Sequence, residues 1–273
     1  MDGIDRRKIG MVALGFALAA SGCRGTGARS DMLVPGHWRG NGWGPEAQAA
    51  RDRGDLQVVP PSPPMVAWDA WGRANLRDGD VAFRMGDSRA FFGLLPFSDL
   101  SAAMADSRFS HTGIIAIEAE GPVVYDTNKQ GPRRQPFAAW AFDAIGPVEI
   151  RRPRPEHQGR VPAALAYCRE VYRRGTPFDN TLKMSDDELY CAEMVEKAYR
   201  SAGLPLCEPT RLADLPRYGD FPGPIRMIRL LSSLEPEQPV IVPGNERIGL
   251  WSSPALGPPM VAPADPTRPA QAD

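Results

Sequence analysis

The sequence predicts an α+β domain in which an antiparallel sheet, or a small barrel, packs against a few helices. Short apolar runs that suit strands lie at 80–84, 113–117, 123–125 and 148–150. Two longer stretches, 161–174 and 189–202, repeat apolar residues at the spacing of a helix face. A mixture of one sheet and a few helices is typical of this fold class.

A hairpin is predicted around the turn residues 119–121. The run 113–117 precedes this turn and 123–125 follows it, and both runs are rich in β-branched residues. The first strand, 80–84, instead follows an Asp-Gly turn, and a late strand is predicted at 240–242.

The length of the hairpin loop decides which side chains share a face. With a loop of two or four residues, His111 lies opposite Asn128 and diagonal to Asp126, on one face of the sheet. A loop of three residues would reverse this parity and exclude both partners. Asp126 and Asn128 are thus alternative neighbours for the His111 ring.

Four helices are predicted from capping and periodicity. Short helices are expected at 98–105, which Ser98 can cap, and at 136–142, where proline occupies the first turn. The two longer helices, 161–174 and 189–202, are each followed by a glycine that can end them. Cys191 lies in the first turn of the last helix, on its apolar face.

The length, charge and composition of the chain are those of a globular protein without a strongly basic surface. The chain has 273 residues and a formal net charge of −1, so its composition gives no support for binding nucleic acid. A hydrophobic content of 42% is enough for a globular core.

The N-terminus has the features of an export signal. Arg6-Arg7-Lys8 is basic, 9–20 is apolar but too short to span a bilayer, and Ala20-Ser21-Gly22-Cys23 ends the stretch. This last segment resembles a bacterial lipobox, which implies that Cys23 is lipidated and that the protein faces the periplasm from the outer membrane. The alternative is an ordinary signal peptide that is cleaved near Cys23.

The chain divides into four predicted segments. Residues 1–22 form the lipoprotein signal peptide and 23–66 a flexible tether without periodicity. The folded domain is expected at 67–252, followed by a disordered tail rich in proline and alanine at 253–273.

Three cysteines remain once Cys23 is assigned to a lipid. Cys168 and Cys207 can form a disulfide in an oxidising compartment and leave Cys191 free. The alternative is that Cys168 and Cys207 are two buried free thiols.

Cys191 and His111 form a candidate nucleophile and base. A helix N-terminus favours a thiolate, and an imidazole can take the thiol proton. The alternative is a core cysteine and a structural histidine. Other polar residues are interpreted as solvated: Glu118, Glu120, Arg133, Arg134 and His157. The alternative for Arg133 and Arg134 is contact with a substrate carboxylate. The cysteines and histidines lack the paired spacing of a zinc site, so no metal or other cofactor is expected.

Four segments in order resemble one family, the circularly permuted papain-like cysteine hydrolases, in the YiiX-like branch of the NlpC-type superfamily. These segments are Asp78-Gly79-Asp80-Val81, Phe109-Ser110-His111-Thr112-Gly113-Ile114-Ile115, Thr176-Pro177-Phe178-Asp179 and Leu189-Tyr190-Cys191-Ala192-Glu193-Met194-Val195. The resemblance implies a permuted papain-like fold in which Cys191 attacks a carbonyl, His111 is base and acid, and Asp126 is the third polar group. Ala192, where many relatives have serine, and the long stretch 85–108 depart from the pattern.

Three functional hypotheses follow. The first is a thiol hydrolase of amide bonds that acts on cell-wall peptides, which the expected location makes available. The second is an acyl ester or lipid hydrolase or acyltransferase with the same three residues. The third is a non-catalytic lipoprotein that binds a ligand in the same cleft, although the paired Cys191 and His111 argue against it.

Overall fold

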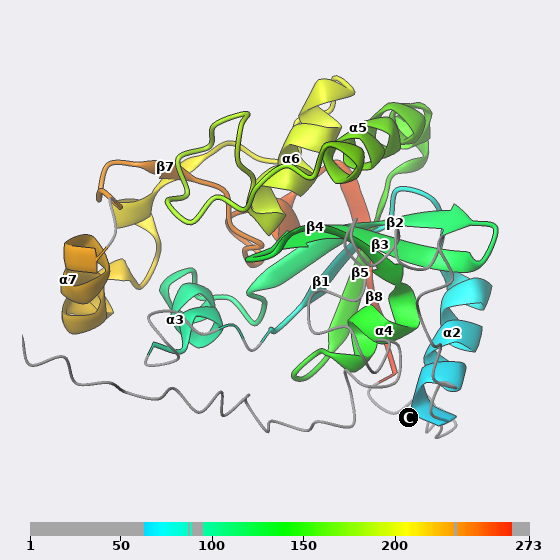
Figure 1. The fold of residues 1–273 in the computed structure, drawn as a ribbon, viewed down its shortest axis with the longest axis horizontal. Coiled ribbons are helices and arrows are strands. Elements are labelled where there is room, and N and C mark those ends of the chain that lie inside the picture. Colours follow the sequence, from blue (N-terminus) through cyan, green and yellow to red (C-terminus); the bar gives the residue numbers. More distant parts are fainter. Residues whose placement is uncertain (1–62, 87, 89–94, 232–233, 264–273) are drawn as a thin grey trace, which may run out of the picture.

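A computed structural model describes residues 63–86, 88, 95–231 and 234–263. Its centre is a six-stranded antiparallel sheet with the order β4-β3-β2-β1-β5-β8 (Figure 1). The strands are β1 (Val81–Arg84), β2 (His111–Glu118), β3 (Gly121–Asn128), β4 (Gly131–Pro136), β5 (Val148–Pro153) and β8 (Leu256–Ala262). A second, two-stranded sheet pairs β6 (Thr210–Arg211) with β7 (Pro239–Val240).

Helices cover both faces of the large sheet and extend beyond one end of it (Figure 1). The α-helices are α2 (Pro63–Asn75), α3 (Phe97–Met104), α4 (Phe137–Phe142), α5 (Val161–Arg174), α6 (Cys191–Ser201) and α7 (Pro222–Leu231). Short 3-10 turns lie at Pro155–Arg160, Leu212–Asp214, Tyr218–Asp220 and Leu250–Ser252. This arrangement confirms the predicted α+β class.

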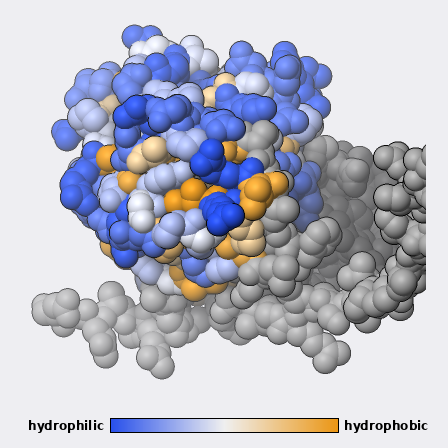
Figure 2. Space-filling view, turned by 90° about the vertical axis from the view of Figure 1, so that its left-hand side faces the viewer, coloured by the Kyte–Doolittle hydropathy of each residue, from blue (hydrophilic) through white to orange (hydrophobic). Residues whose placement is uncertain are grey.

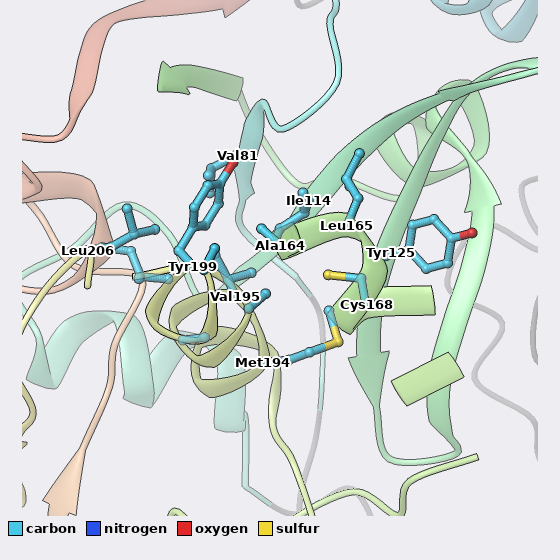
Figure 3. Close-up of a cluster of buried hydrophobic side chains, with 14 of the residues drawn as sticks. Val81, Ile114, Tyr125, Ala164, Leu165, Cys168, Met194, Val195, Tyr199 and Leu206 are labelled. Atoms are coloured by element: carbon cyan, nitrogen blue, oxygen red, sulfur yellow. The ribbon is translucent and has the colours of Figure 1, made fainter. Parts of the chain in front are cut away.

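One core lies between the sheet and the pair α5 and α6. Ile114 and Tyr125 of the hairpin meet Leu165 of α5 and Val195 of α6 in a buried cluster (Figure 3). These apolar residues recur at helical spacing on α5 and α6, so each helix presents one hydrophobic stripe to the sheet. Gly175 ends α5 in a left-handed conformation (φ 65°), as its position predicted.

A second core lies on the opposite face, under α2 and α4. Ile115 and Val124 of the hairpin contribute to it, together with Trp140 and Phe137 of α4. The Trp68 ring of α2 meets the Phe137 ring edge to face, with centroids 5.9 Å apart. Burial on both faces explains why the central strands are uniformly apolar rather than alternating.

The β2–β3 hairpin has a two-residue turn, so the predicted parity is correct. Ile117 pairs with Pro122 and Glu118 with Gly121. Continuing this register places Gly113 beside Asp126. A Cβ added to Gly113 would lie 2.5 Å from the Val124 side chain, so only glycine lets the strands approach this closely.

The predicted domain boundaries are wrong at both ends. Helix α2 begins at Pro63, inside the predicted tether, because the residues after 62 have an apolar face that packs on α4. Strand β8 pairs with β5, so 256–262 are part of the sheet and not of a disordered tail. The predictions for 1–62 and 264–273, including the lipidation of Cys23, lie outside the described residues.

The three described cysteines, Cys168, Cys191 and Cys207, are all free thiols. The disulfide alternative is therefore wrong, and buried Cys168 packs as part of the first core. Within the described part of the chain, no helix is both long and apolar enough to cross a membrane.

Candidate active site

Cys191 is the first residue of α6, where a helix leaves backbone N–H groups without acceptors of its own. The preceding residue, Tyr190, is extended (φ −103°, ψ 169°) and ends the loop that leads to the helix. The Tyr190 hydroxyl accepts a hydrogen bond from the Ile241 N–H at 2.7 Å, which fixes this junction from the other side. The nucleophile candidate is thus held at a defined helix start.

A buried carboxylate shapes the loop before α6. Asp179 accepts hydrogen bonds from the backbone N–H groups of Thr181 (2.7 Å) and Lys183 (2.6 Å). The Leu189 N–H donates to the Pro177 carbonyl at 2.9 Å and closes the loop. The Thr-Pro-Phe-Asp motif therefore supports the approach to the helix, which is a structural role.

His111, the first residue of β2, contacts Asp126 of β3. The His111 Nε2 atom lies 2.6 Å from Asp126 Oδ2. Asn128, the alternative partner, instead donates to the Gln130 side chain at 3.0 Å. The structure thus selects Asp126 as the neighbour of the imidazole.

Two further side chains enclose Asp126, and neither was assigned to the site from the sequence. Arg133 of β4 donates through Nε to Asp126 Oδ1 at 2.8 Å and through Nη2 to Oδ2. Trp140 of α4 donates through Nε1 to Oδ2 at 2.9 Å. The interpretation of Arg133 as a solvated loop residue is wrong, because it lies buried in a strand beside Asp126.

The surroundings of His111 and Asp126 shift the pKa values of both side chains and so set their charges at rest. Burial lowers the pKa of His111 to about 4, and the Arg84 and Arg133 charges act in the same direction against the Asp126 hydrogen bond. Burial alone would raise the pKa of Asp126, but the Arg133 charge and the His111 hydrogen bond hold it well below its usual range. Asp126 is ionised and His111 is neutral in the resting site.

The thiol of Cys191 is also neutral at rest, in contrast to the expected thiolate. Burial raises its pKa to about 11, although hydrogen bonds from the Thr112, Ala192 and Cys191 N–H groups favour the charged form. The Thr112 N–H belongs to the peptide that follows His111, so the thiol lies against the histidine segment. Among the described residues, no hydrogen bond joins Cys191 Sγ to the imidazole. In free enzymes the distance between a nucleophile and its base is often long, and it shortens when substrate binds.

An apolar cavity of about 110 Å³ opens beside Cys191. Its lining comes from α3, from α7, from the segments between them and from residues that follow α7, and includes Met104, Phe178, Leu215, Ile228 and Ile241. Arg229 is the one charged residue among the described lining residues. Figure 2 views the side of the molecule that carries α7 and shows a hydrophobic patch within a largely hydrophilic surface. Helix α3 lies in the long stretch 85–108, so this departure from the family pattern contributes to the lining of the cavity.

Several residues singled out in the sequence have structural roles. Asp80 is buried and forms an ion pair with Arg152 at 2.7 Å. Glu118 is not solvated, because it accepts a hydrogen bond from the Tyr125 hydroxyl at 2.7 Å and pairs with Arg134. His157 lies in the 3-10 turn Pro155–Arg160.

Across residues 63–86, 88, 95–231 and 234–263, no group of three or more His, Cys, Asp or Glu side chains is placed to hold a metal ion.

The fold and site define a papain-like thiol hydrolase in which the histidine precedes the cysteine. Residues 76–215 match the model of the permuted papain-like amidase family of YaeF and YiiX, also called C92. The chain belongs to this family, and is therefore a cysteine hydrolase of the amidase class.

Two comparisons agree with this assignment. The chain is 28% identical over 156 residues to the uncharacterized protein YiiX of Escherichia coli K12, covering 56% of this chain and 69% of that protein. It also resembles the crystal structure of a protein described as metalloprotein YiiX from Escherichia coli O157:H7. That match has a TM-score of 0.53 and 23% identity, and covers 68% of this chain and 96% of the other.

Proposed function

We propose that this chain hydrolyses an amide bond through a covalent intermediate on Cys191. His111 Nδ1 takes the thiol proton as sulfur attacks the carbonyl carbon, and the proton then passes to the leaving amine. Water, activated by the same imidazole, cleaves the thioester and releases a carboxylic acid. The observation that carries this proposal is the His111–Asp126 contact beside a thiol at a helix N-terminus.

The start of α6 supplies a place for the oxyanion. The backbone N–H groups of Cys191 and Ala192 lie at the free end of the helix, close to the thiol. Donors fixed in this way stabilise the negative charge that forms on the carbonyl oxygen, and the helix dipole adds to the effect.

The cavity favours an apolar acyl group as the part of the substrate that lies beside Cys191. Cell-wall peptides carry charged and polar groups, for which a lining with one charged residue offers few partners. An acyl chain gains about 0.8 kcal/mol per methylene on burial. We therefore favour an N-acyl amide over a cell-wall peptide, with an acyl ester as a related substrate.

The proposal also includes a place in the cell. Arg6-Arg7-Lys8, the apolar run 9–20 and the small residues before Cys23 support export and lipidation. Attachment to the outer membrane would hold the domain near both acyl lipids and the cell wall.

Turnover of matched substrates tests the proposal. The full chain would be assayed with N-acyl amides of increasing acyl length and with cell-wall peptide fragments, alongside Cys191→Ala. We expect hydrolysis of the acyl amides to improve with length and to be lost in Cys191→Ala, which keeps the wild-type circular dichroism. Full activity in Cys191→Ala would refute the mechanism, and a preference for the peptide fragments would refute the substrate class.

A further inference from the structure

Arg133 and Asp126 face each other across two paired strands. They are register partners on β4 and β3, so the backbone brings the two side chains together on one face of the sheet. The guanidinium contacts both carboxylate oxygens, with Nε on Oδ1 at 2.8 Å and Nη2 on Oδ2. Both side chains are buried, so this bidentate contact fixes the plane of the carboxylate.

A third donor completes the shell around the same carboxylate. Trp140 Nε1 donates to Asp126 Oδ2 at 2.9 Å, and the Trp140 ring stacks beside the His111 ring at 6.0 Å between centroids. Asp126 Oδ2 therefore meets Trp140, Arg133 and His111 at once. With both oxygens held, neither the carboxylate nor the imidazole can rotate freely.

The protonation of the ring follows from this geometry. An ionised carboxylate only accepts hydrogen bonds, so His111 Nε2 must carry the proton that bridges it to Asp126. Nδ1 is then left with a lone pair for the thiol proton. Asp126 can enforce this tautomer only while its carboxylate is ionised and oriented toward Nε2. The Arg133 charge keeps the carboxylate ionised, and the bidentate contact holds its orientation.

We propose that Arg133 is a positioning residue for the reaction: it holds Asp126 as the acceptor that keeps His111 in the Nε2–H tautomer, with Nδ1 as the base. This inference rests on the proposed function, because it concerns the same imidazole. It adds a fourth member to the Cys191, His111 and Asp126 set.

The charges around His111 determine whether its pKa rises or falls when the Arg133 charge is removed. Asp126 on β3 stabilises the imidazolium, whereas Arg133 on β4 and Arg84 on β1 oppose it. Cys191 on α6 is neutral at rest, and Trp140 on α4 carries no charge. Loss of the Arg133 charge therefore raises the pKa of His111 and moves the acidic limb of reactivity to higher pH.

Arg134 provides a matched control. It is the next residue on β4, has the same chemistry and pairs with Glu118 and Glu120 on the other face of the strand. Arg134→Gln removes an arginine ion pair from the same strand without touching Asp126. Any effect shared by Arg133→Gln and Arg134→Gln reflects strand stability rather than positioning.

The experiment measures alkylation of Cys191 by iodoacetamide against pH, in the full chain, with the modified peptide identified by mass spectrometry. We expect Arg133→Gln to lower the plateau rate about 10–100-fold, by analogy with the loss of a group that orients a metal-bound histidine, and to move the acidic limb up by about one pH unit. Arg134→Gln should match wild type. Equal profiles for the two variants, with folded protein, would overturn the inference.

Two further variants distinguish a failure of the positioning inference from a failure of the proposed function. Arg133→Lys keeps the charge but loses the bidentate contact, so it should lower the plateau without moving the limb, and it replaces Arg133→Gln if that variant does not fold. The nitrogen-15 spectrum of the imidazole, assigned with His111→Gln, should show loss of the Nε2–H tautomer in Arg133→Lys; a retained tautomer would refute positioning. If His111→Ala leaves alkylation unchanged, the proposed function itself fails.

Discussion

In the proposed reaction one proton passes from Cys191 to His111, and the surroundings of the two side chains decide which of them is charged at rest. Burial disfavours both charged forms, so the resting pair is a neutral thiol and a neutral imidazole. The helix N-terminus and the Thr112 N–H favour a thiolate, but they are outweighed in the closed site. The sequence indicated the helix N-terminus that favours a thiolate. It could not indicate the burial of Cys191, which depends on the tertiary packing around the cavity.

The low pKa of His111 has a consequence for stability. In the unfolded chain this histidine binds its proton near pH 6.5, but in the folded protein only near pH 4. The unfolded state therefore gains protons first as the pH falls, and stability falls with it. We expect His111→Gln, which keeps a donor for Asp126, to abolish a loss of about 2 kcal/mol between pH 7 and pH 5.

Chemical denaturation at several pH values checks this difference. Glu193 must be considered, because burial raises its pKa to about 7 and gives the opposite slope, with stability falling as the pH rises toward 7. The comparison of wild type with His111→Gln removes this shared contribution. Parallel stability curves for the two proteins would show that His111 titrates normally in the folded state.

At the scale of elements, the central hairpin and the long helices could be predicted, and the edge strands could not. The hairpin β2–β3 and helix α5 have clear periodicity and turn residues. Strands β4 and β8 lie at the two edges of the sheet and contain prolines, at 132, 136, 258 and 259. Proline argues against a strand in the interior of a sheet, but an edge strand tolerates it on the side that needs no donor.

Because β4 was not predicted from the sequence, Arg133 was not assigned to the site. Arg133 belongs to that strand, and without the strand its position opposite Asp126 could not be inferred. Trp140 reaches the same carboxylate from α4, which was predicted, but a helix position alone does not say which side chain it meets. A possible signal was the Asn-Lys-Gln-Gly turn after β3, which is typical of a second hairpin.

Helix α7 closes the far side of the apolar cavity and lies outside the residues that match the family model. Ile228 is buried and lines the cavity, whereas Leu230 on the same helix is 76% exposed. We expect Ile228→Trp to shorten the longest N-acyl amide that is hydrolysed, because the larger side chain fills the space. Leu230→Trp is the control and should leave chain-length preference unchanged.

Competition between acyl amides of different lengths gives this readout directly. A uniform loss of activity at all lengths in Ile228→Trp would mean that α7 supports the fold and does not select the substrate. An unchanged preference with full activity would place the acyl group elsewhere.

On the scale of the whole molecule, the site depends on segments that are far apart in the sequence. Asp126, Arg133 and Trp140 come from consecutive elements, but Cys191 is brought to them only by the packing of α6 on β2 and β3. The four motifs in order were enough to predict the family and the fold. The cavity and the ion pairs required the tertiary structure.

The corrected boundaries give a test of the fold. A fragment of residues 63–263 keeps α2 and β8, whereas 67–252 loses β8 and the start of α2. We expect the longer fragment to unfold cooperatively and the shorter one to be strongly destabilised, because removal of β8 exposes the edge of β5 and opens the second core. Thermal unfolding followed by circular dichroism compares them, and equal melting temperatures would show that β8 is dispensable.

The most direct test of the central claim is the mass of the protein after brief mixing with an activated acyl ester. Wild type should gain one acyl group, mapped to the Cys191 peptide as a thioester that hydroxylamine removes. His111→Ala should acylate far more slowly, and Cys191→Ser should yield no thioester. An acyl group on another residue, or acylation of Cys191 at the same rate without His111, would contradict the account.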